Sequence, residues 1–248
     1  RAVGMSVPGE AAQAVNRGGT TGTSRPLHFE MCSGRFSYSA AEKEHENGHY
    51  GFSRAERKTL WFRHCARRGQ PNFLLSRGVE RGTKVGILLM NCLEWLPIYF
   101  GILKAGCIAV PLNFRYASDE ISYCLDLADV EVLVFGPEFV SRLDPIQESL
   151  TRVKIRLFVG RNVPGYAEDC RRLMGFCSSS VPPIALSEDD DAAIYFSSGT
   201  TGFPKAILHR HKALVCSCMT EQHHHGQTKD DVFLCIPPLY HTGAKMHW

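Results

Sequence analysis

Residues 195–205 read Tyr-Phe-Ser-Ser-Gly-Thr-Thr-Gly-Phe-Pro-Lys, a run of small and hydroxyl-bearing residues that ends in Pro204-Lys205. A run of serine, threonine and glycine is by itself typical of a flexible linker. This run is framed by two apolar stretches, Ala192–Phe196 and Ala206–Leu208, each of which predicts a short strand. A linker has no need of such a frame, so we interpret the run as a structured loop between two strands.

The loop has the composition of a phosphate-binding site. Gly199 and Gly202 let backbone N–H groups approach an anion closely, and the hydroxyls and the Lys205 ammonium add further donors. The spacing differs from that of the nucleotide P-loop, in which four residues separate the glycines and lysine directly follows the second glycine. Here two residues separate the glycines and Phe203-Pro204 precede the lysine, so P-loop kinases and GTPases are excluded.

From about Asn72 onward, the chain alternates apolar strand signals with stretches of helical spacing. This alternation is typical of an α/β fold with a largely parallel sheet, so we expect layered sheets with flanking helices. A polar, acidic connector is expected over Ser178–Asp191. The expected strands cover Lys84–Met90, Ile108–Val110, Glu131–Phe135, Ile155–Gly160, Ala192–Phe196, Ala206–Leu208 and Asp231–Cys235. The expected helices cover Asn72–Gly78, Asn91–Lys104, Ser118–Asp126 with Ser118 as N-cap, a stretch from Pro137, and His211–Met219.

Composition and charge exclude several classes of function. A formal charge of +3 over 248 residues, without a basic patch interleaved with aromatics, gives no support to nucleic-acid binding. The longest apolar runs, such as Val85–Met90, are far shorter than the ~20 residues that span a bilayer. Ten scattered cysteines without Cys-x-x-Cys spacing are expected to be reduced thiols. Because residues 1–20 also lack an apolar signal-peptide core, we expect a cytoplasmic protein.

Two short charged or metal-binding patterns have simpler explanations. His223-His224-His225 has the residue type of a metal site, but three adjacent histidines rarely converge on one ion, so we assign no metal ligand. Gly226–Lys229 behind them is expected to be a solvated turn. Arg171-Arg172 is expected to be a solvated pair rather than a reader of phosphates.

The loop resembles the signature loop of the adenylate-forming superfamily, which includes acyl-CoA synthetases, aryl-CoA ligases, luciferases and peptide-synthetase adenylation domains. That loop has the form Ser/Thr-Ser/Thr-Gly-Ser/Thr-Thr-Gly-x-Pro-Lys, usually followed by glycine, where this chain has Ala206. His211 stands where a histidine usually closes the motif. Three further segments resemble family elements in the same order, namely Asn91–Trp95, Leu103–Asn113 and Pro237–Gly243. The resemblance covers about Asn72 to Trp248.

The resemblance implies an enzyme that couples a carboxylic acid to ATP, with Mg²⁺, and passes the acyl group to coenzyme A. It implies that the phosphates are held by Ser197, Ser198, Gly199, Thr200, Thr201, Gly202, Pro204 and Lys205. Lys205 and His241 are the implied catalytic residues, and His241 also contacts the nucleotide and the acid. Thr242 and Gly243 are implied to bind the acid beside it. Without the surrounding motif, a histidine in a loop before a helix is a packed structural residue about as often as it is a functional one.

The class of acid follows from an absence in the sequence. Amino-acid-activating members of the superfamily place an aspartate in the segment that lines the pocket, and no acidic residue occurs from Cys235 to Trp248. The resemblance therefore implies a fatty acid, with an aryl acid as the alternative.

The two ends of the chain differ from the family pattern. Residues 1–70 carry no family feature, and we expect either an N-terminal extension or a shifted reading frame there. Over residues 71–248 we expect a partial AMP-binding domain, truncated at its C-terminal end and inactive alone. A truncated, non-catalytic nucleotide-binding relative is the alternative, and a homodimer stays open.

Overall fold

The computed structural model describes residues 72–177, 184–197, 202–228, 231 and 235–245. These residues form one mixed sheet of seven strands in the order β5-β4-β3-β1-β2-β6-β7. All neighbouring strands are parallel except β6 and β7, which pair antiparallel. The strands are β1 (Lys84–Leu88), β2 (Ile108–Pro111), β3 (Val130–Phe135), β4 (Ile155–Phe158), β5 (Glu168–Asp169), β6 (Asp191–Ser197) and β7 (Lys205–Arg210).

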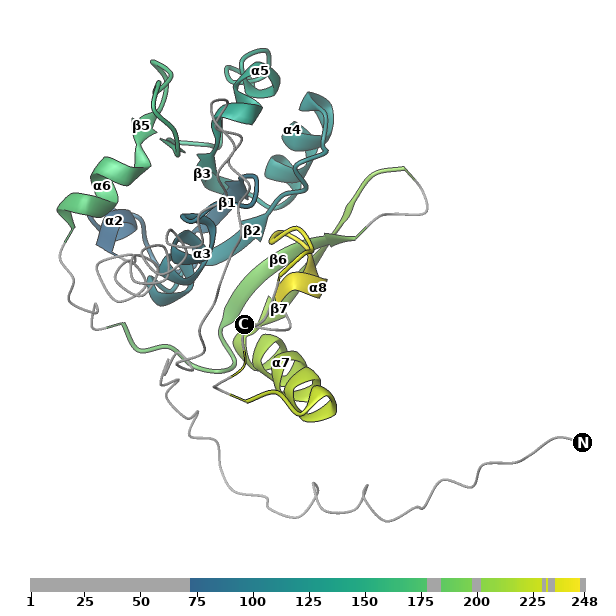
Figure 1. The fold of residues 1–248 in the computed structure, drawn as a ribbon. Coiled ribbons are helices and arrows are strands. Elements are labelled where there is room, and N and C mark those ends of the chain that lie inside the picture. Colours follow the sequence, from purple (N-terminus) through teal and green to yellow (C-terminus); the bar gives the residue numbers. More distant parts are fainter. Residues whose placement is uncertain (1–71, 178–183, 198–201, 229–230, 232–234, 246–248) are drawn as a thin grey trace, which may run out of the picture.

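Helices cover both faces of the sheet (Figure 1). Residues of α2, α3 and α6 pack on one face, and residues of α4 and α5 pack on the other. The helices are α2 (Asn72–Leu75), α3 (Trp95–Lys104), α4 (Ser118–Leu127), the short 3₁₀ turn η1 (Pro137–Phe139), α5 (Val140–Leu143), α6 (Cys170–Phe176), α7 (His211–His225) and α8 (Thr242–Lys245). The expected α/β architecture with flanking helices is confirmed.

Two hydrophobic cores follow from the alternation of side chains along each strand. Val132 and Val134 of β3 point into the core that contains Trp95 of α3, whereas Leu133 and Phe135 point into the other core. Strands buried on both faces read as continuous apolar runs, which is why this part of the fold could be predicted from the sequence.

Four expected helix boundaries are wrong. Helix α2 ends at Leu75 rather than Gly78. Helix α3 begins at Trp95 rather than Asn91. Ser118 is the first helical residue of α4 and Ala117 is its N-cap, because the Glu120 carboxylate accepts the Ala117 N–H over 2.9 Å. Helix α7 continues six residues beyond Met219 to His225, and it ends where Gly226 adopts φ +62°.

The acidic connector before β6 is held by ion pairs. Asp190 lies 2.6 Å from an Arg81 guanidinium nitrogen, and Asp189 pairs with Lys212 at the start of α7. The main-chain oxygen of Asp190 also accepts the His211 N–H. These contacts fix the beginning of β6 relative to α7. Residues 178–183 of the expected connector lie outside the described residues, as do residues 1–71 and most of the expected strand Asp231–Cys235.

The described cysteines are free thiols, as expected, and several are deeply buried. Burial raises the pKa of Cys92, Cys107 and Cys124 to about 12. At neutral pH these thiols stay protonated and behave as small apolar side chains. Among the helices that the structure describes, none combines the length and the apolar character that crossing a bilayer requires.

Candidate functional site

The phosphate-loop candidate is the connection of a β-hairpin. β6 ends at Ser197 and β7 begins at Lys205, and these two residues are paired in the antiparallel register. The pairing brings Lys205 back to the point where the loop leaves the sheet, although seven residues separate it from Ser197. Figure 1 shows this hairpin extending beyond the rest of the sheet. Of the residues assigned to the loop, Ser198, Gly199, Thr200 and Thr201 lie outside the described part.

The second half of the loop has a conformation that glycine favours. Gly202 adopts φ +104°, a region that residues with a Cβ rarely enter. Pro204 is buried, and Lys205 behind it is exposed. Among the carboxylates that the structure describes, none lies within ion-pair distance of the Lys205 ammonium. Its charge is therefore open to an anionic ligand as far as the described residues go.

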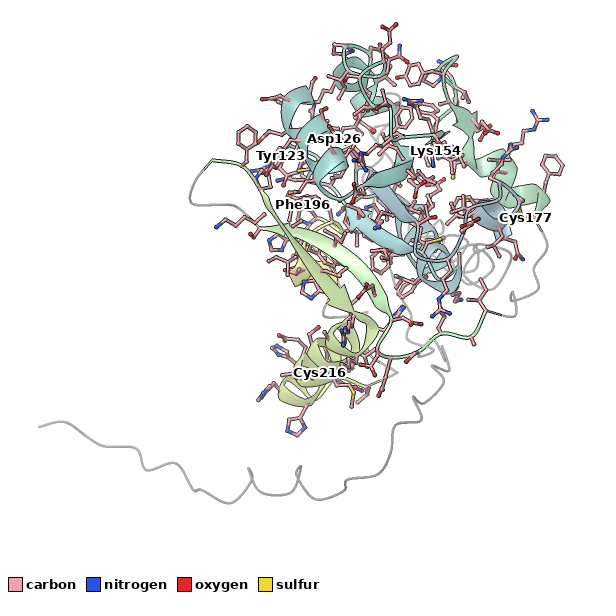
Figure 2. The ribbon with its side chains drawn as sticks, turned by 180° about the vertical axis from the view of Figure 1, so that it is seen from behind. Tyr123, Asp126, Lys154, Cys177, Phe196 and Cys216 are labelled. Carbon is pink, nitrogen blue, oxygen red and sulfur yellow. The ribbon has the colours of Figure 1, made fainter. Side chains whose placement is uncertain are left out.

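An aromatic contact joins the loop to the helix layer. The ring of Phe203 lies 4.7 Å, centroid to centroid, from the ring of Tyr123 on α4. Figure 2 shows Tyr123 on the side of α4 that faces the hairpin, with Phe196 of β6 nearby. The family motif assigns no role to Phe203, which stands at its variable position. The available signal was a large apolar residue in an otherwise small and polar loop.

The strand that leads into the loop is fixed by a buried pair of hydroxyls. The Tyr195 hydroxyl on β6 lies 3.0 Å from the Tyr99 hydroxyl on α3, and either can donate the hydrogen bond. Burial raises the pKa of both tyrosines, so both stay neutral across the physiological range. This pair locks β6 against α3 and gives the loop a rigid base.

The segment Pro237–Gly243, which carries the candidate His241, is tied to the ends of two central strands. The Leu239 N–H donates to Oδ1 of Asn91, three residues after β1, over 2.8 Å. The Tyr240 ring makes an edge contact with Phe114, three residues after β2, at 5.2 Å between centroids. Leu239 itself is buried in the core.

The imidazole of His241 is tied to its own segment through one ring nitrogen. Its Nδ1 accepts the Gly243 N–H over 3.1 Å, so a neutral ring carries its hydrogen on Nε2. The His241 side chain is exposed, and Thr242 begins the short helix α8. The geometry makes His241 a hydrogen-bond donor through Nε2.

The phosphate-loop candidate and the segments anchored to Asn91 and Phe114 all lie at the carboxyl ends of the parallel strands, which form one edge of the sheet. β1, β2 and β6 are parallel, so Asn91, Phe114 and the loop after Ser197 all follow carboxyl ends of strands at the same edge. In open α/β sheets this edge is where ligands bind. The described groups there are hydroxyl, amide, ammonium and imidazole donors, which suits an anionic phosphate or carboxylate. Ser197, Gly202, Lys205 and His241 include no carboxylate, so they do not by themselves make a Mg²⁺ site.

The histidine run is not a metal centre in the described structure. His223, His224 and His225 form the last turn of α7, where successive side chains point in different directions around the helix axis. His225 Nε2 lies 3.1 Å from the Glu221 carboxylate. Within the described ranges, no group of three or more histidine, cysteine, aspartate or glutamate side chains could hold an ion. Placing His223–His225 inside the helix corrects the boundary expected at Met219.

Comparison with known proteins identifies relatives of this site and fold. The sequence profile of the family described as AMP-binding enzyme matches residues 71–247. The chain is 27% identical over 184 residues to 4-hydroxybutyrate–CoA ligase 2 of Metallosphaera sedula, which covers 71% of this chain and 33% of that protein. It is 28% identical over 236 residues to crotonobetaine/carnitine–CoA ligase of Salmonella typhimurium, which covers 90% of this chain and 40% of that protein.

A solved structure of an anthranilate CoA ligase in complex with anthranoyl-AMP is also similar. It superimposes with a TM-score of 0.61 and 27% identity, covering 65% of this chain and 31% of that one. The chain thus spans a third to two fifths of the length of the curated relatives named above. Because the family profile matches well over half of its residues, the chain belongs to the AMP-binding enzyme family.

Proposed function

We propose that this protein uses ATP to activate a carboxylic acid as an acyl-adenylate and then transfers the acyl group to the thiol of coenzyme A. The observation that carries the proposal is the hairpin register, which pairs Ser197 with Lys205 at the mouth of the glycine-containing loop. Family membership and the CoA-ligase activities named for the relatives support it.

The chemistry requires mainly positioning and charge stabilisation. An oxygen of the acid's carboxylate attacks the α-phosphorus of ATP, and pyrophosphate leaves. In this proposal Lys205, the Ser197 hydroxyl and the N–H groups around Gly202 hold the β- and γ-phosphates, because anionic oxygens are stabilised by preorganised donors. Mg²⁺ would neutralise further charge on the phosphates when bound.

His241 would act on the acid and the adenylate. In the neutral ring Nε2 carries the hydrogen and is the donor, since Nδ1 accepts the Gly243 N–H. A donor in this position can orient the attacking carboxylate and stabilise charge on the acyl-phosphate oxygens. Thr242 and Gly243 would line the acid's binding surface beside it.

We further propose an aliphatic acid of the fatty-acid class as the substrate. The segment Cys235–Trp248 carries no carboxylate that could pair with an amino group, which argues against amino acids. The alternative is an aryl acid, favoured by the similarity to an anthranilate CoA ligase. The cytoplasmic location and a homodimer stay predictions.

The first experiment measures binding of Mg-ATP to the 248-residue chain by isothermal titration calorimetry. We expect K205M to weaken binding about tenfold or more, because a charge-assisted contact to phosphate is lost. The matched control is K154M, which removes an exposed lysine on the far side of the sheet from the hairpin (Figure 2) and a surface ion pair with Glu131. Equal affinities of K205M and K154M would overturn the role of the loop.

The second experiment assays acid-dependent pyrophosphate release and acyl-CoA formation by the product of the complete reading frame that contains these residues. A panel of aliphatic acids of increasing chain length is compared with benzoate and anthranilate. Activity with aliphatic acids supports the proposed substrate class, and a clear preference for the aromatic acids selects the alternative. Binding of ATP without turnover of any acid would instead favour a non-catalytic nucleotide-binding protein.

A further inference from the structure

The side chain of Asn91 bridges two parts of the chain that are far apart in sequence. Its Oδ1 accepts the Leu239 N–H over 2.8 Å, and its Nδ2 donates to the Pro237 carbonyl over 3.4 Å. Asn91 follows β1, the central strand of the sheet, so its own position is set by the core. A carboxamide offers a donor and an acceptor side by side, which is the pattern that an adjacent strand would present.

The Pro237–Leu239 backbone needs such a partner. Two consecutive prolines, Pro237 and Pro238, have no N–H, so this stretch cannot form a regular ladder with a neighbouring strand. Leu239 therefore supplies the first N–H after Cys235-Ile236, and that N–H goes to Asn91. The next bond, from the His241 N–H to the Pro238 carbonyl at 3.0 Å, closes a turn on the same segment.

We propose that Asn91 is a positioning residue for His241: its carboxamide fixes Pro237–Leu239 at the carboxyl end of β1 and thereby sets where the His241 imidazole stands at the site. The inference rests on the proposed function for its catalytic consequence. The Phe114 ring against Tyr240 holds the same segment from β2, so Asn91 supplies the polar half of a two-point attachment.

Substitutions at position 91 separate the two hydrogen bonds. N91D keeps an oxygen for the Leu239 N–H but replaces the donor to Pro237 with a second acceptor. N91A removes both contacts. Since the bond to Leu239 is shorter than the bond to Pro237, we expect N91A to have a larger effect than N91D.

The first test is amide hydrogen exchange in the 248-residue chain, followed by mass spectrometry of peptides that contain Leu239 and His241. We expect N91A to raise the exchange rate of these two amides about threefold to tenfold, the effect of one lost hydrogen bond. N91D should raise it less. Peptides from β1 and β2 should exchange as in the wild type. Unchanged exchange at Leu239 in N91A would overturn the proposal.

A matched control removes a comparable bond elsewhere. Asp169 accepts the Arg172 N–H over 3.0 Å as N-cap of α6, beside the outermost strand β5, which three strand positions separate from β1. D169A should raise exchange at the start of α6 and leave Leu239 and His241 unaffected. If D169A raised the exchange rate at Leu239 as much as N91A does, general destabilisation would explain the increase and the proposal would be contradicted.

The catalytic test uses the product of the complete reading frame. We expect N91A to lower kcat for acyl-adenylate formation about tenfold while the KM for ATP changes less than twofold, because the described hairpin contacts of Lys205 do not involve Asn91. In an H241A background, N91A should have little further effect, since the two residues act through one path. Additive losses would overturn the link to His241. Absence of any acid activation in the wild type would refute the proposed function, whereas the exchange experiment would still decide whether Asn91 positions the segment.

Discussion

The Nε of Arg171 on α6 lies 2.6 Å from Oε1 of Glu94, whose side chain is only 7% exposed. Glu94 is the residue before α3, so this ion pair joins the beginning of α3, in the segment Asn91–Trp95, to α6. A carboxylate this deeply buried is costly unless it is paired. Arg171 and Arg172 are both exposed, as a solvated pair would be, but Arg171 also pairs with the buried Glu94 carboxylate, a contact that the sequence did not indicate.

We expect R171A to lower the free energy of unfolding by about 1–2 kcal/mol. The loss is below the full cost of breaking a buried pair because the Arg171 side chain is 50% exposed and water screens the interaction. Urea unfolding monitored by circular dichroism measures it. The neighbouring R172A is the control: Arg172 only covers the exposed Phe176 ring, so its loss should change stability by about 0.5 kcal/mol or less. Equal effects of the two variants would contradict this role for Glu94.

His211 gives the fold a dependence on pH. The side chain is 3% exposed at the start of α7, and burial lowers its pKa below the usual 6.5, although the nearby Asp190 partly offsets the shift. The unfolded chain therefore binds a proton near pH 6.5 that the folded chain does not bind until lower pH. His211 contributes its full stability above pH 6.5, and this contribution is lost as the pH falls through the pKa of the folded state.

The measurement compares urea midpoints of the wild type and H211Q at pH 7.5 and pH 5.5. We expect the wild type to lose more stability than H211Q on acidification, since glutamine does not titrate. Exposed His224 supplies the control variant, H224Q, which should retain the slope of the wild type. Parallel pH profiles for the wild type and H211Q would show that this group does not titrate with folding.

The parts of the fold that were predictable are those in which one local pattern decides the structure. The residues Val132–Phe135 form a continuous apolar run because β3 is buried on both faces, and the run alone indicates a strand. The sequence predicts too early an end for α7, at Met219, because the helix surface is mostly exposed and lacks an apolar stripe that would mark its full length. Gly226 held the missing signal, since a glycine with positive φ commonly ends a helix.

For the candidate site too, the sequence identifies the functional residues but not the contacts that position them. A motif suffices to point to Lys205 and His241, because their chemistry is carried by residue types in a fixed order. The contacts that hold them could not be read from the sequence. Asn91 and Leu239 are 148 residues apart, and only the pairing of strands brings them together. The same holds for Tyr123 and Phe203, which meet only because α4 covers the face of the sheet beside the hairpin.

The Tyr123–Phe203 contact leads to the last prediction, which concerns nucleotide affinity. The two rings lie at 40° to one another and are partly exposed, Tyr123 by 36% and Phe203 by 53%. An aromatic pair of this kind contributes about 0.5–1.5 kcal/mol. Because Phe203 stands directly between Gly202 and Pro204-Lys205, losing its anchor should loosen the half of the loop that carries the lysine. We expect Y123A to raise the Kd for Mg-ATP about threefold to tenfold.

Y123F is the matched control, because it keeps the ring and removes only the hydroxyl. It should bind Mg-ATP as the wild type does, whereas F203A should resemble Y123A. The double variant Y123A/F203A should be no weaker than either single variant, since both remove the same contact. Calorimetric titration with Mg-ATP measures the Kd of all four variants, to be compared with the Kd of the wild type. If Y123F weakened binding as much as Y123A, the hydroxyl would be the relevant group, and stacking on Phe203 would not explain how the loop is held.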